Sequence, residues 1–234
     1  MNKDELEILN FSTTLKDLYA QSILNNKVSG LSTINNLSVI RGIILKENCL
    51  NTLEIGLAFG ASALTILSTL KEIDNSSSNH SAIDPFQKRD FANTAINLIK
   101  SEKLDQKFNF FESPSYEVLP ELLKNKKKFD LIYIDGSHRF EDIFVDFYYS
   151  SLILEMNGII LFDDCTRLDS YKVIKFIKTN YKRFFNEIEY KKYDKRPKTL
   201  IKNIANKFGY RQLYGFKKIA EPPRSRFKDP FKNF

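Results

Sequence analysis

The sequence predicts an α/β fold in which a doubly wound, mainly parallel sheet carries helices on both faces and extra helices precede it. From residue 48 onward, short apolar runs alternate with amphipathic stretches of about 10–15 residues, a pattern typical of βαβ units. Polar and often acidic residues follow the apolar runs, at the positions where parallel strands of such sheets end. A chain of 234 residues has the length of one such domain with additional elements.

Residues 1–47 are expected to form an N-terminal helical extension. Leucines at roughly helical spacing predict an amphipathic helix over residues 3–25. A polar break at residues 25–27 separates it from a second expected helix over residues 34–47. Extra helices should therefore precede the alternating region.

The main domain is expected over residues 48–220. Its expected strands are residues 50–55, a strand that ends at Ile83, and residues 108–111, 129–134 and 158–162. Its expected helices are residues 61–73, 89–102, 115–125, 140–155 and 169–181. Residues 211–219 predict a late edge strand, and residues 221–234, which contain three prolines, predict an irregular basic tail.

Composition restricts the class of protein. Hydrophobic residues make up 42% and charged residues 28%, as in ordinary globular proteins. No stretch reaches about 18 uninterrupted apolar residues, and the charged N-terminus lacks the apolar core of a signal peptide. We therefore expect a cytoplasmic protein without a membrane span. The two cysteines, Cys49 and Cys165, make neither a disulfide framework nor a metal knuckle.

The net charge of +7 is unevenly distributed along the chain. Residues 182–234 contain 16 of the 36 Lys and Arg residues but 5 of the 29 Asp and Glu residues. Such a region can attract nucleic acid, anionic lipid or a phosphorylated substrate, or it can be a solvated surface. We favour the solvated surface, because no motif that reads RNA or DNA accompanies the charge.

A glycine-containing turn follows the first expected strand. Gly56 and Gly60 flank residues 57–59, and a helix is expected from residue 61. Glycines let the backbone approach a ligand closely, and a helix N-terminus presents free N–H groups. Position 58 is not glycine, so the spacing differs from the dinucleotide-binding fingerprint. The alternative is a tight structural turn.

Asp84 ends the second expected strand. A carboxylate at this place in a doubly wound sheet accepts hydrogen bonds from the hydroxyls of a ribose. Together with the glycine turn, it indicates a ligand that contains adenosine. The alternative is a capping role before Pro85.

Five segments carry a resemblance to a known family: Leu53–Gly60, Ile83–Asp84, Ser115–Pro120, Asp130–His138 and Gly158–Asp164. In this order they resemble the motifs of class I S-adenosylmethionine-dependent methyltransferases. More narrowly, they resemble catechol O-methyltransferase-like enzymes and bacterial O-methyltransferases that act on sugar or natural-product hydroxyls. The resemblance covers about residues 45–182 and implies a Rossmann-like sheet. The residues it implies for the cofactor are Glu54, Gly56 and Gly60 at the methionine portion, Asp84 at the ribose, Ser115 at the adenine edge, and Asp135.

Asp135, Asp163 and Asp164 follow two of the expected strands. Three neighbouring carboxylates repel one another unless a cation lies between them, and Mg²⁺ prefers oxygen ligands. Metal-dependent members of the resembling family place their ligands at these strand ends. The resemblance therefore implies that these three residues bind Mg²⁺ or another divalent cation, which would activate the acceptor hydroxyl. The alternative is that Asp163 or Asp164 caps the next helix or contacts the cofactor.

His138 lies three residues after Asp135. The resemblance places His138 where catechol-type enzymes carry a lysine that takes the substrate proton. An imidazole titrates near neutrality and suits that task. His138 and Asp135 are thus the expected catalytic residues, with a packing or capping role for His138 as the alternative.

The predicted function is Mg-assisted transfer of a methyl group from S-adenosylmethionine to a hydroxyl of a small molecule or glycan. The alternatives are a metal-independent methyltransferase acting on RNA and a nucleoside- or NAD-binding Rossmann oxidoreductase. Against the RNA methyltransferase, the chain lacks an Asn-Pro-Pro-Tyr-like loop. Against the oxidoreductase, position 58 lacks the middle glycine of the dinucleotide-binding fingerprint. We expect no nucleic-acid partner, and whether the chain forms a homo-oligomer stays open.

Overall fold

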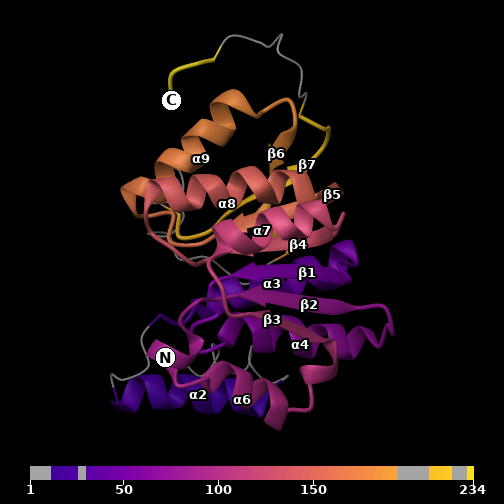
Figure 1. Ribbon diagram of the computed structural model, residues 1–234, viewed down its shortest axis with the longest axis vertical. Coiled ribbons are helices and arrows are strands. Elements are labelled where there is room, and N and C mark those ends of the chain that lie inside the picture. Colours follow the sequence, from indigo (N-terminus) through magenta and orange to yellow (C-terminus); the bar gives the residue numbers. More distant parts are fainter. Residues whose placement is uncertain (1–11, 26–29, 194–210, 223–230) are drawn as a thin grey trace.

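The computed structural model describes residues 12–25, 30–193, 211–222 and 231–234. Its centre is a seven-stranded sheet in the order β3-β2-β1-β4-β5-β7-β6, seen as the stack of arrows in Figure 1. The first five strands are parallel, and β7 is antiparallel to both of its neighbours. The strands are β1 (Asn51–Ile55), β2 (Asn79–Ile83), β3 (Phe108–Phe111), β4 (Phe129–Ile134), β5 (Leu154–Phe162), β6 (Phe185–Glu187) and β7 (Tyr214–Lys218).

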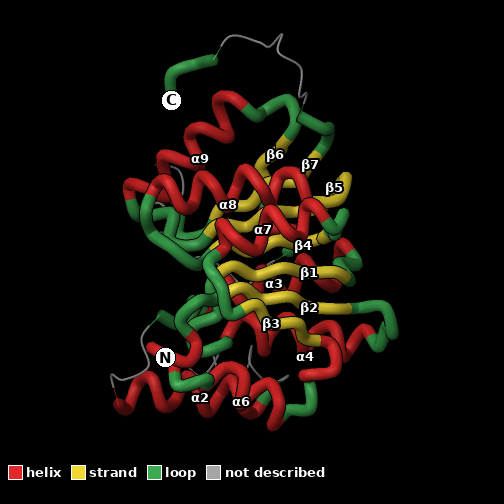
Figure 2. Tube along the Cα trace, viewed as in Figure 1, coloured by secondary structure: helices red, strands yellow, loops and turns green. Residues whose placement is uncertain are grey.

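Helices cover both faces of this sheet, and in Figure 2 one group of them lies in front of the strands. That group is α7 (Ser115–Lys124), α8 (Phe140–Ile153) and α9 (Leu168–Asn180); the opposite face carries α3 (Ile34–Glu47) and α4 (Ala61–Ile73). Along β4, Ile132 and Ile134 are buried against the front group, whereas Leu131 and Tyr133 are buried against α3 and α4. Successive side chains of a strand point to opposite faces, so β4 is apolar on both sides. The predicted doubly wound α/β fold is confirmed.

A further apolar cluster joins the N-terminal helices to the main domain. Leu15 of α2 (Thr13–Asn25) and Leu37 of α3 are buried with Leu64 of α4 and Ile99 of α6 (Thr94–Ser101). The helix expected over residues 3–25 is described only from Thr13, because residues 1–11 lie outside the described residues. The described N-terminal helices therefore contribute to the domain core.

Two element boundaries differ from those that the sequence predicts. The helix expected over residues 89–102 is divided into α5 (Gln87–Phe91) and α6, because Ala92 and Asn93 both have left-handed backbone conformations. The helix expected over residues 140–155 ends at Ile153, and β5 begins at Leu154 rather than at residue 158. Leu154 is fully buried and pairs with Phe129 of β4, so this residue is part of the sheet and the helix ends before it. Short 3-10 turns lie at Asp105–Lys107 and Tyr190–Lys192.

The prediction of a late edge strand over residues 211–219 is wrong in one respect. β7 forms there, but it lies between β5 and β6 rather than at the edge. The edge strand is β6, a three-residue segment with no apolar run that would have predicted it. Gly215 of β7 leaves room for the side chains of Ile188 and Leu161, since a Cβ there would lie 2.6 Å from an atom of each.

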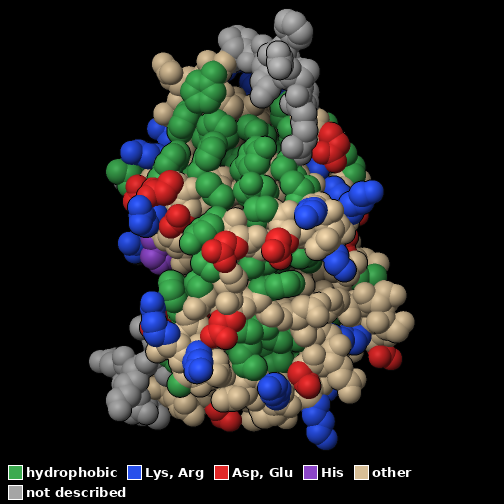
Figure 3. Space-filling model, in the orientation of Figure 1, with side chains coloured by type: hydrophobic (Ala, Val, Ile, Leu, Met, Phe, Trp, Pro, Cys, Tyr) green, Lys and Arg blue, Asp and Glu red, His purple; other side chains and the backbone are tan. Residues whose placement is uncertain are grey.

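The described C-terminal residues pack beside α9. The ring centroids of Phe231 and Phe234 lie 6.1 and 5.2 Å from that of Phe176. Figure 3 shows hydrophobic side chains gathered over the α8 and α9 region of this face. Residues 223–230 of the expected basic tail lie outside the described residues. Among the described residues, none of the helices combines the length and the hydrophobicity that a membrane span requires.

Candidate active site

A pocket opens at the carboxyl ends of β1 and β4. It is lined by residues 30–32 before α3, by the turn and first residues of α4 over residues 56–62, and by Asp135 after β4. This is the edge of an open α/β sheet at which ligands bind. The pocket therefore collects the glycine turn and one of the predicted acidic residues, together with an N-terminal segment.

Gly56 and Gly60 shape the turn at this pocket. Their φ angles are +93° and +83°, in the left-handed region that favours glycine. A Cβ on Gly56 would lie 2.3 Å from the carbonyl oxygen of Asp135, and a Cβ on Gly60 would lie 2.8 Å from the Cβ of Ala95. Gly60 has no side chain to cap α4, and Ala61 and Ser62 of the first turn of this helix line the pocket. Both glycines are thus needed for close approach of protein segments around the pocket.

Glu54 lies behind the pocket rather than in its wall. Its side chain is fully buried and accepts a hydrogen bond from the hydroxyl of Ser62, which does line the pocket. The second carboxylate oxygen lies 3.3 Å from Nε2 of His80, which is also fully buried. Glu54 is placed to orient Ser62, and its predicted contact with the methionine portion of a cofactor stays a prediction.

Asp84 is bonded to the glycine turn. Its Oδ2 atom accepts the backbone N–H groups of Leu57 at 3.0 Å and Ala58 at 2.9 Å. Oδ2 also accepts the side-chain amide of Gln87 at 3.1 Å, and Oδ1 accepts the N–H of Phe86 at 2.8 Å. Asp84 is 4% exposed, and its hydrogen bonds hold the glycine turn in place. A ribose contact by Asp84 stays a prediction.

Ser115 lies at the start of α7, directly after β3 and its short loop. Its side chain hydrogen-bonds to Asp146 of α8, which is almost fully buried. Burial raises the pKa of Asp146 to about 7, although the bond from Ser115 opposes the increase. The predicted contact of Ser115 with adenine is untested.

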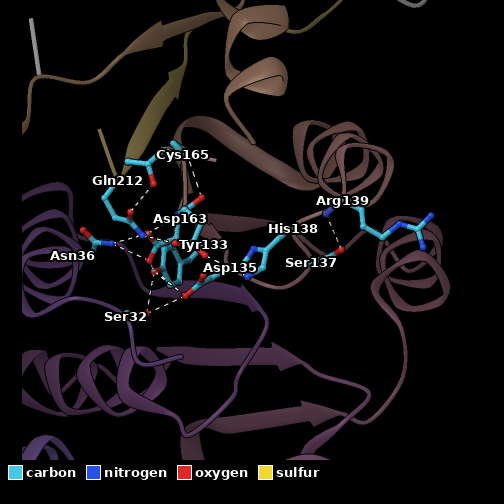
Figure 4. A network of polar contacts seen from close by, with 12 residues as sticks. Ser32, Asn36, Tyr133, Asp135, Ser137, His138, Arg139, Asp163, Cys165 and Gln212 are labelled. Atoms are coloured by element: carbon cyan, nitrogen blue, oxygen red, sulfur yellow. Dashed lines mark hydrogen bonds and ion pairs between the residues drawn. The ribbon is translucent and has the colours of Figure 1, made fainter. Parts of the chain in front are cut away.

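Figure 4 shows that a polar network joins Asp135 and Asp163 through Tyr133. The Oδ2 atom of Asp135 accepts hydrogen bonds from Ser32 at 3.0 Å and from the hydroxyl of Tyr133 at 3.1 Å. The same hydroxyl is also within hydrogen-bond distance of Oδ2 of Asp163, so its single proton is donated to one of the two acids at a time. Tyr133 is fully buried, and it lies two residues before Asp135, hence on the same side of β4.

Two side-chain amides complete the surroundings of Asp163. Nδ2 of Asn36, on the first turn of α3, lies 2.8 Å from both oxygens of this carboxylate. Nε2 of Gln212, just before β7, lies 3.0 Å from Oδ1 and also donates to Asp164. Asn36 and Gln212 are not predicted from the sequence, because both are far from Asp163 along the chain.

His138 and Asp164 form the outer part of the site. Nε2 of His138 lies 3.3 Å from Oδ2 of Asp164, and the His138 side chain is 42% exposed. Asp164 follows directly on Asp163, and its backbone is left-handed with φ 50°. The imidazole is thereby held by a carboxylate and remains accessible to a bound molecule.

Burial and mutual repulsion affect the protonation of Asp135 and Asp163. Burial raises the pKa of Asp135 well above its usual range, and the nearby Asp163 raises it further. Burial also raises the pKa of Asp163, while hydrogen bonds from Tyr133 and Asn36 lower it. The two carboxylates with their shared tyrosine therefore hold protons more strongly than exposed acids would.

The expected metal ligands do not form a metal cage. Among the described residues, no group of three or more His, Cys, Asp or Glu side chains is arranged to hold a metal ion. Both oxygens of Asp163 already accept donors, and Oδ1 of Asp164 accepts Gln212. The structure thus brings Asp135, Asp163 and Asp164 to one edge of the sheet, as predicted, but surrounds the middle one with N–H and O–H groups.

Comparison with known proteins finds a family model and a curated relative that match part of this chain. Residues 53–165 match a family model described as a methyltransferase domain. A putative caffeoyl-CoA O-methyltransferase of Arabidopsis thaliana is 30% identical over 118 residues, which are 50% of this chain and 47% of the relative. The match thus spans about half the length of that curated relative.

Solved structures extend the similarity over most of the chain. An O-methyltransferase from Bacillus cereus, solved in complex with SAH, superimposes with a TM-score of 0.65 at 14% identity and covers 89% of this chain and 91% of that one. TomG from Streptomyces achromogenes, an O-methyltransferase involved in tomaymycin synthesis and solved with SAM, gives 0.65 at 13% identity, over 93% and 96%. A putative caffeoyl-CoA O-methyltransferase from Staphylococcus aureus gives 0.63 at 14%, over 94% and 100%.

The strand order and the position of the pocket after β1 agree with the match of residues 53–165 to the methyltransferase-domain model. The matched segment is just under half of the chain, and the fold of the chain is that of the O-methyltransferases named above.

Proposed function

We propose that this chain transfers a methyl group from S-adenosylmethionine to a hydroxyl oxygen of a small molecule or glycan. The observation that carries the proposal is the accessible His138, held 3.3 Å from Asp164 at the edge of the sheet where the pocket lies. A hydroxyl must lose its proton to attack a methyl group, and a histidine oriented by a carboxylate suits that task. The similarity to a putative caffeoyl-CoA O-methyltransferase supports an oxygen acceptor.

The cofactor is proposed to occupy the pocket over residues 30–32 and 56–62. Ser62 and the N-terminus of α4 would bind its polar methionine end, with Gly56 and Gly60 giving the backbone room and Glu54 orienting Ser62. Asp84 would act on the ribose side and Ser115 at the adenine edge, as the resemblance implies.

In the proposed reaction, the acceptor oxygen attacks the methyl carbon as the bond from that carbon to sulfur breaks. The products are a methyl ether and S-adenosylhomocysteine. With Nε2–H of His138 directed to Asp164, the Nδ1 lone pair accepts the hydroxyl proton. The Asp164 carboxylate then stabilises the imidazolium that results.

The expected magnesium ion has no step in this mechanism. In a metal-dependent enzyme the ion would lower the pKa of the acceptor hydroxyl. Here the oxygens of Asp163 are engaged by Asn36, Tyr133 and Gln212, so the residues as arranged do not fit the ion. Magnesium assistance, which the sequence predicts, is therefore left out of the proposed function, and chelation tests it.

The two alternative functions have less support. The turn after β1 has alanine rather than glycine at position 58, unlike the dinucleotide fingerprint. Half of the 16 basic residues of the 182–234 region that suggested an RNA acceptor lie in residues 194–210 and 223–230, outside the described residues. The cytoplasmic location and a homo-oligomeric state stay predictions.

The function is tested by following radioactive methyl transfer from S-adenosylmethionine to a panel of catechols, hydroxycinnamoyl thioesters, sugars and an RNA pool. Label should appear on a hydroxyl compound and not on RNA. In parallel, S-adenosylhomocysteine should raise the melting temperature, whereas NAD and NADP should not. Stabilisation by NAD alone, or methyl transfer to RNA alone, would overturn the proposal.

A further inference from the structure

The Asp163 carboxylate is saturated with hydrogen-bond donors. Oδ1 accepts Asn36 Nδ2 at 2.8 Å, Gln212 Nε2 at 3.0 Å and the backbone N–H of Asp164 at 2.7 Å. Oδ2 accepts Asn36 Nδ2 at 2.8 Å and the hydroxyl of Tyr133. A carboxylate offers about four lone-pair positions in total. A metal ion could bind Asp163 only if some of these donors left.

The donors are held in place by separate parts of the fold. Asn36 lies on the first turn of α3, where the side chain of the helix cap Thr33 accepts the Asn36 backbone N–H at 3.2 Å. The Gln212 carbonyl oxygen accepts the backbone N–H of Cys165 at 2.9 Å. The hydroxyl of Thr166 lies 3.3 Å from Oε1 of Gln212, so the Gln212 side chain directs its NH₂ group to the acids.

These donors have the wrong chemistry for a shared metal site. Mg²⁺ binds oxygen atoms at about 2.0–2.1 Å in near-octahedral geometry, and an N–H group aimed at the same oxygen opposes it. Donors of this kind can replace a cation, however. A buried carboxylate is costly unless it is paired or hydrogen-bonded, and two or three N–H bonds favour its charged form. Asp163 is 7% exposed and receives such bonds.

Asp164, next to Asp163, is the acid that contacts the proposed base. Oδ1 of Asp164 accepts the amide of Gln212, and Oδ2 faces Nε2 of His138. Gln212 therefore connects the buried Asp163 to the acid that orients the proposed base. In this arrangement the amides fix the position of Asp164, and the proton of the acceptor passes to His138 rather than to an ion-bound oxygen.

We propose that Asn36, Tyr133 and Gln212 replace a divalent cation at this site. Their N–H and O–H groups stabilise the buried acids and position Asp164, so the chain binds no metal at the strand ends of β4 and β5. Asn36 and Gln212 are positioning residues, since each acts through an acid. The inference rests on the proposed methyl transfer only for its catalytic consequence; the absence of metal binding is measured independently.

The first test is Mn²⁺ binding to EDTA-stripped wild-type protein with S-adenosylhomocysteine bound, followed by electron paramagnetic resonance and calorimetry. We expect no stoichiometric site, and unchanged methyl transfer when EDTA is present. One Mn²⁺ bound per chain at micromolar concentration, or activity lost with EDTA and restored by Mg²⁺, overturns the inference. If no acceptor is methylated at all, the Mn²⁺ measurement still decides the inference, while the proposed function fails separately.

The second test converts the donors into oxygen ligands. Asn36→Asp and Gln212→Glu should each lower the melting temperature, because a further acid faces Asp163, and Mn²⁺ should restore much of that loss. Asn35→Asp adds the same charge at the exposed neighbouring position and is the matched control, with no response to Mn²⁺ expected. If wild type and both variants respond equally to Mn²⁺, the amides do not exclude the ion. If Asn36→Asp fails to fold, Gln212→Glu and the wild-type titration decide.

Discussion

The Oδ2 atom of Asp84 accepts the backbone N–H of Ala58 at 2.9 Å, so the acid at the end of β2 holds the turn that follows β1. The neighbouring N–H of Leu57 donates to the same oxygen. Ala58 has a positive φ of 44°, which is unfavourable for a residue with a side chain. The carboxylate thereby keeps the pocket wall in a conformation that the chain would not adopt alone.

Asp84→Ala should weaken binding of S-adenosylhomocysteine at least about tenfold, measured by calorimetry. Hydrogen bonds to a charged acceptor contribute roughly 1.5–3 kcal/mol each, and the variant removes two to the turn as well as any contact with a ribose. Asp90→Ala, at an exposed acid paired with Arg89, is the control that should bind normally. Unchanged affinity in Asp84→Ala would remove this residue from the cofactor site.

His138→Ala should lower kcat by about 100-fold or more, as expected for loss of a general base. The affinity for S-adenosylhomocysteine and the melting temperature should change little, because the side chain is 42% exposed. Asp164→Asn should lower kcat in the same direction, since it removes the charge that stabilises the imidazolium. Turnover at saturating cofactor, followed from pH 5 to 9, is the measurement.

Arg139→Ala is the matched control for His138, because its side chain is 74% exposed and forms an ion pair with Glu141, two residues away. It should retain normal turnover. If His138→Ala keeps wild-type turnover and its pH profile, the proton goes elsewhere, and the paired histidine has a structural role.

The sequence predicts those site residues that the sheet itself brings together. Asp135, His138, Asp163 and Asp164 all follow strands, and the carboxyl ends of parallel strands share one edge. Tyr133 also carried a usable signal, because it lies two positions before Asp135 and therefore on the same side of β4. Periodicity and strand ends are local properties of the sequence, so they can be recognised without knowledge of the fold.

The donors around Asp163 depend instead on contacts between distant segments. Asn36 lies 127 residues and Gln212 49 residues from the acid that they share. Neither belongs to a motif, and each reaches the site only because α3 packs on the sheet and β7 inserts beside β5. The same long-range pairing decides that β7 is internal and that the three-residue β6 forms the edge. Local sequence patterns do not contain this information.

Asp146→Asn should make the protein more stable at pH 8 than wild type, with little difference at pH 4. Burial raises the pKa of Asp146 to about 7 from 3.8, so between these values the folded chain keeps a proton that the unfolded chain releases. Stability contributed by this group therefore falls as the pH rises from about 4 to 7 and stays low above that. The difference at pH 8 should be on the order of a few kcal/mol at most.

Urea unfolding of both proteins at pH 4 and pH 8 measures this difference. Asp169→Asn, at an exposed acid of α9, is the control and should follow the wild-type pH dependence. A parallel pH dependence in wild type and Asp146→Asn would show that Asp146 ionises as an exposed acid does.

Gly56→Ala should destabilise the fold and abolish cofactor binding, whereas Gly30→Ala should do much less. Both glycines line the pocket and have positive φ angles, +93° and +82°, so alanine at either position carries the left-handed penalty of roughly 1–2 kcal/mol. Of the two, Gly56 is the position at which the added Cβ also meets the backbone, 2.3 Å from the carbonyl oxygen of Asp135. At Gly30 no atom of the described residues lies within 4 Å. Because backbone cannot rotate away as a side chain does, the ends of β1 and β4 must separate, and the pocket between them changes shape. Denaturant unfolding and calorimetry with S-adenosylhomocysteine compare the two variants. Equal losses in both would mean that strain at a positive φ, and not the close contact between Gly56 and Asp135, determines the shape of this pocket.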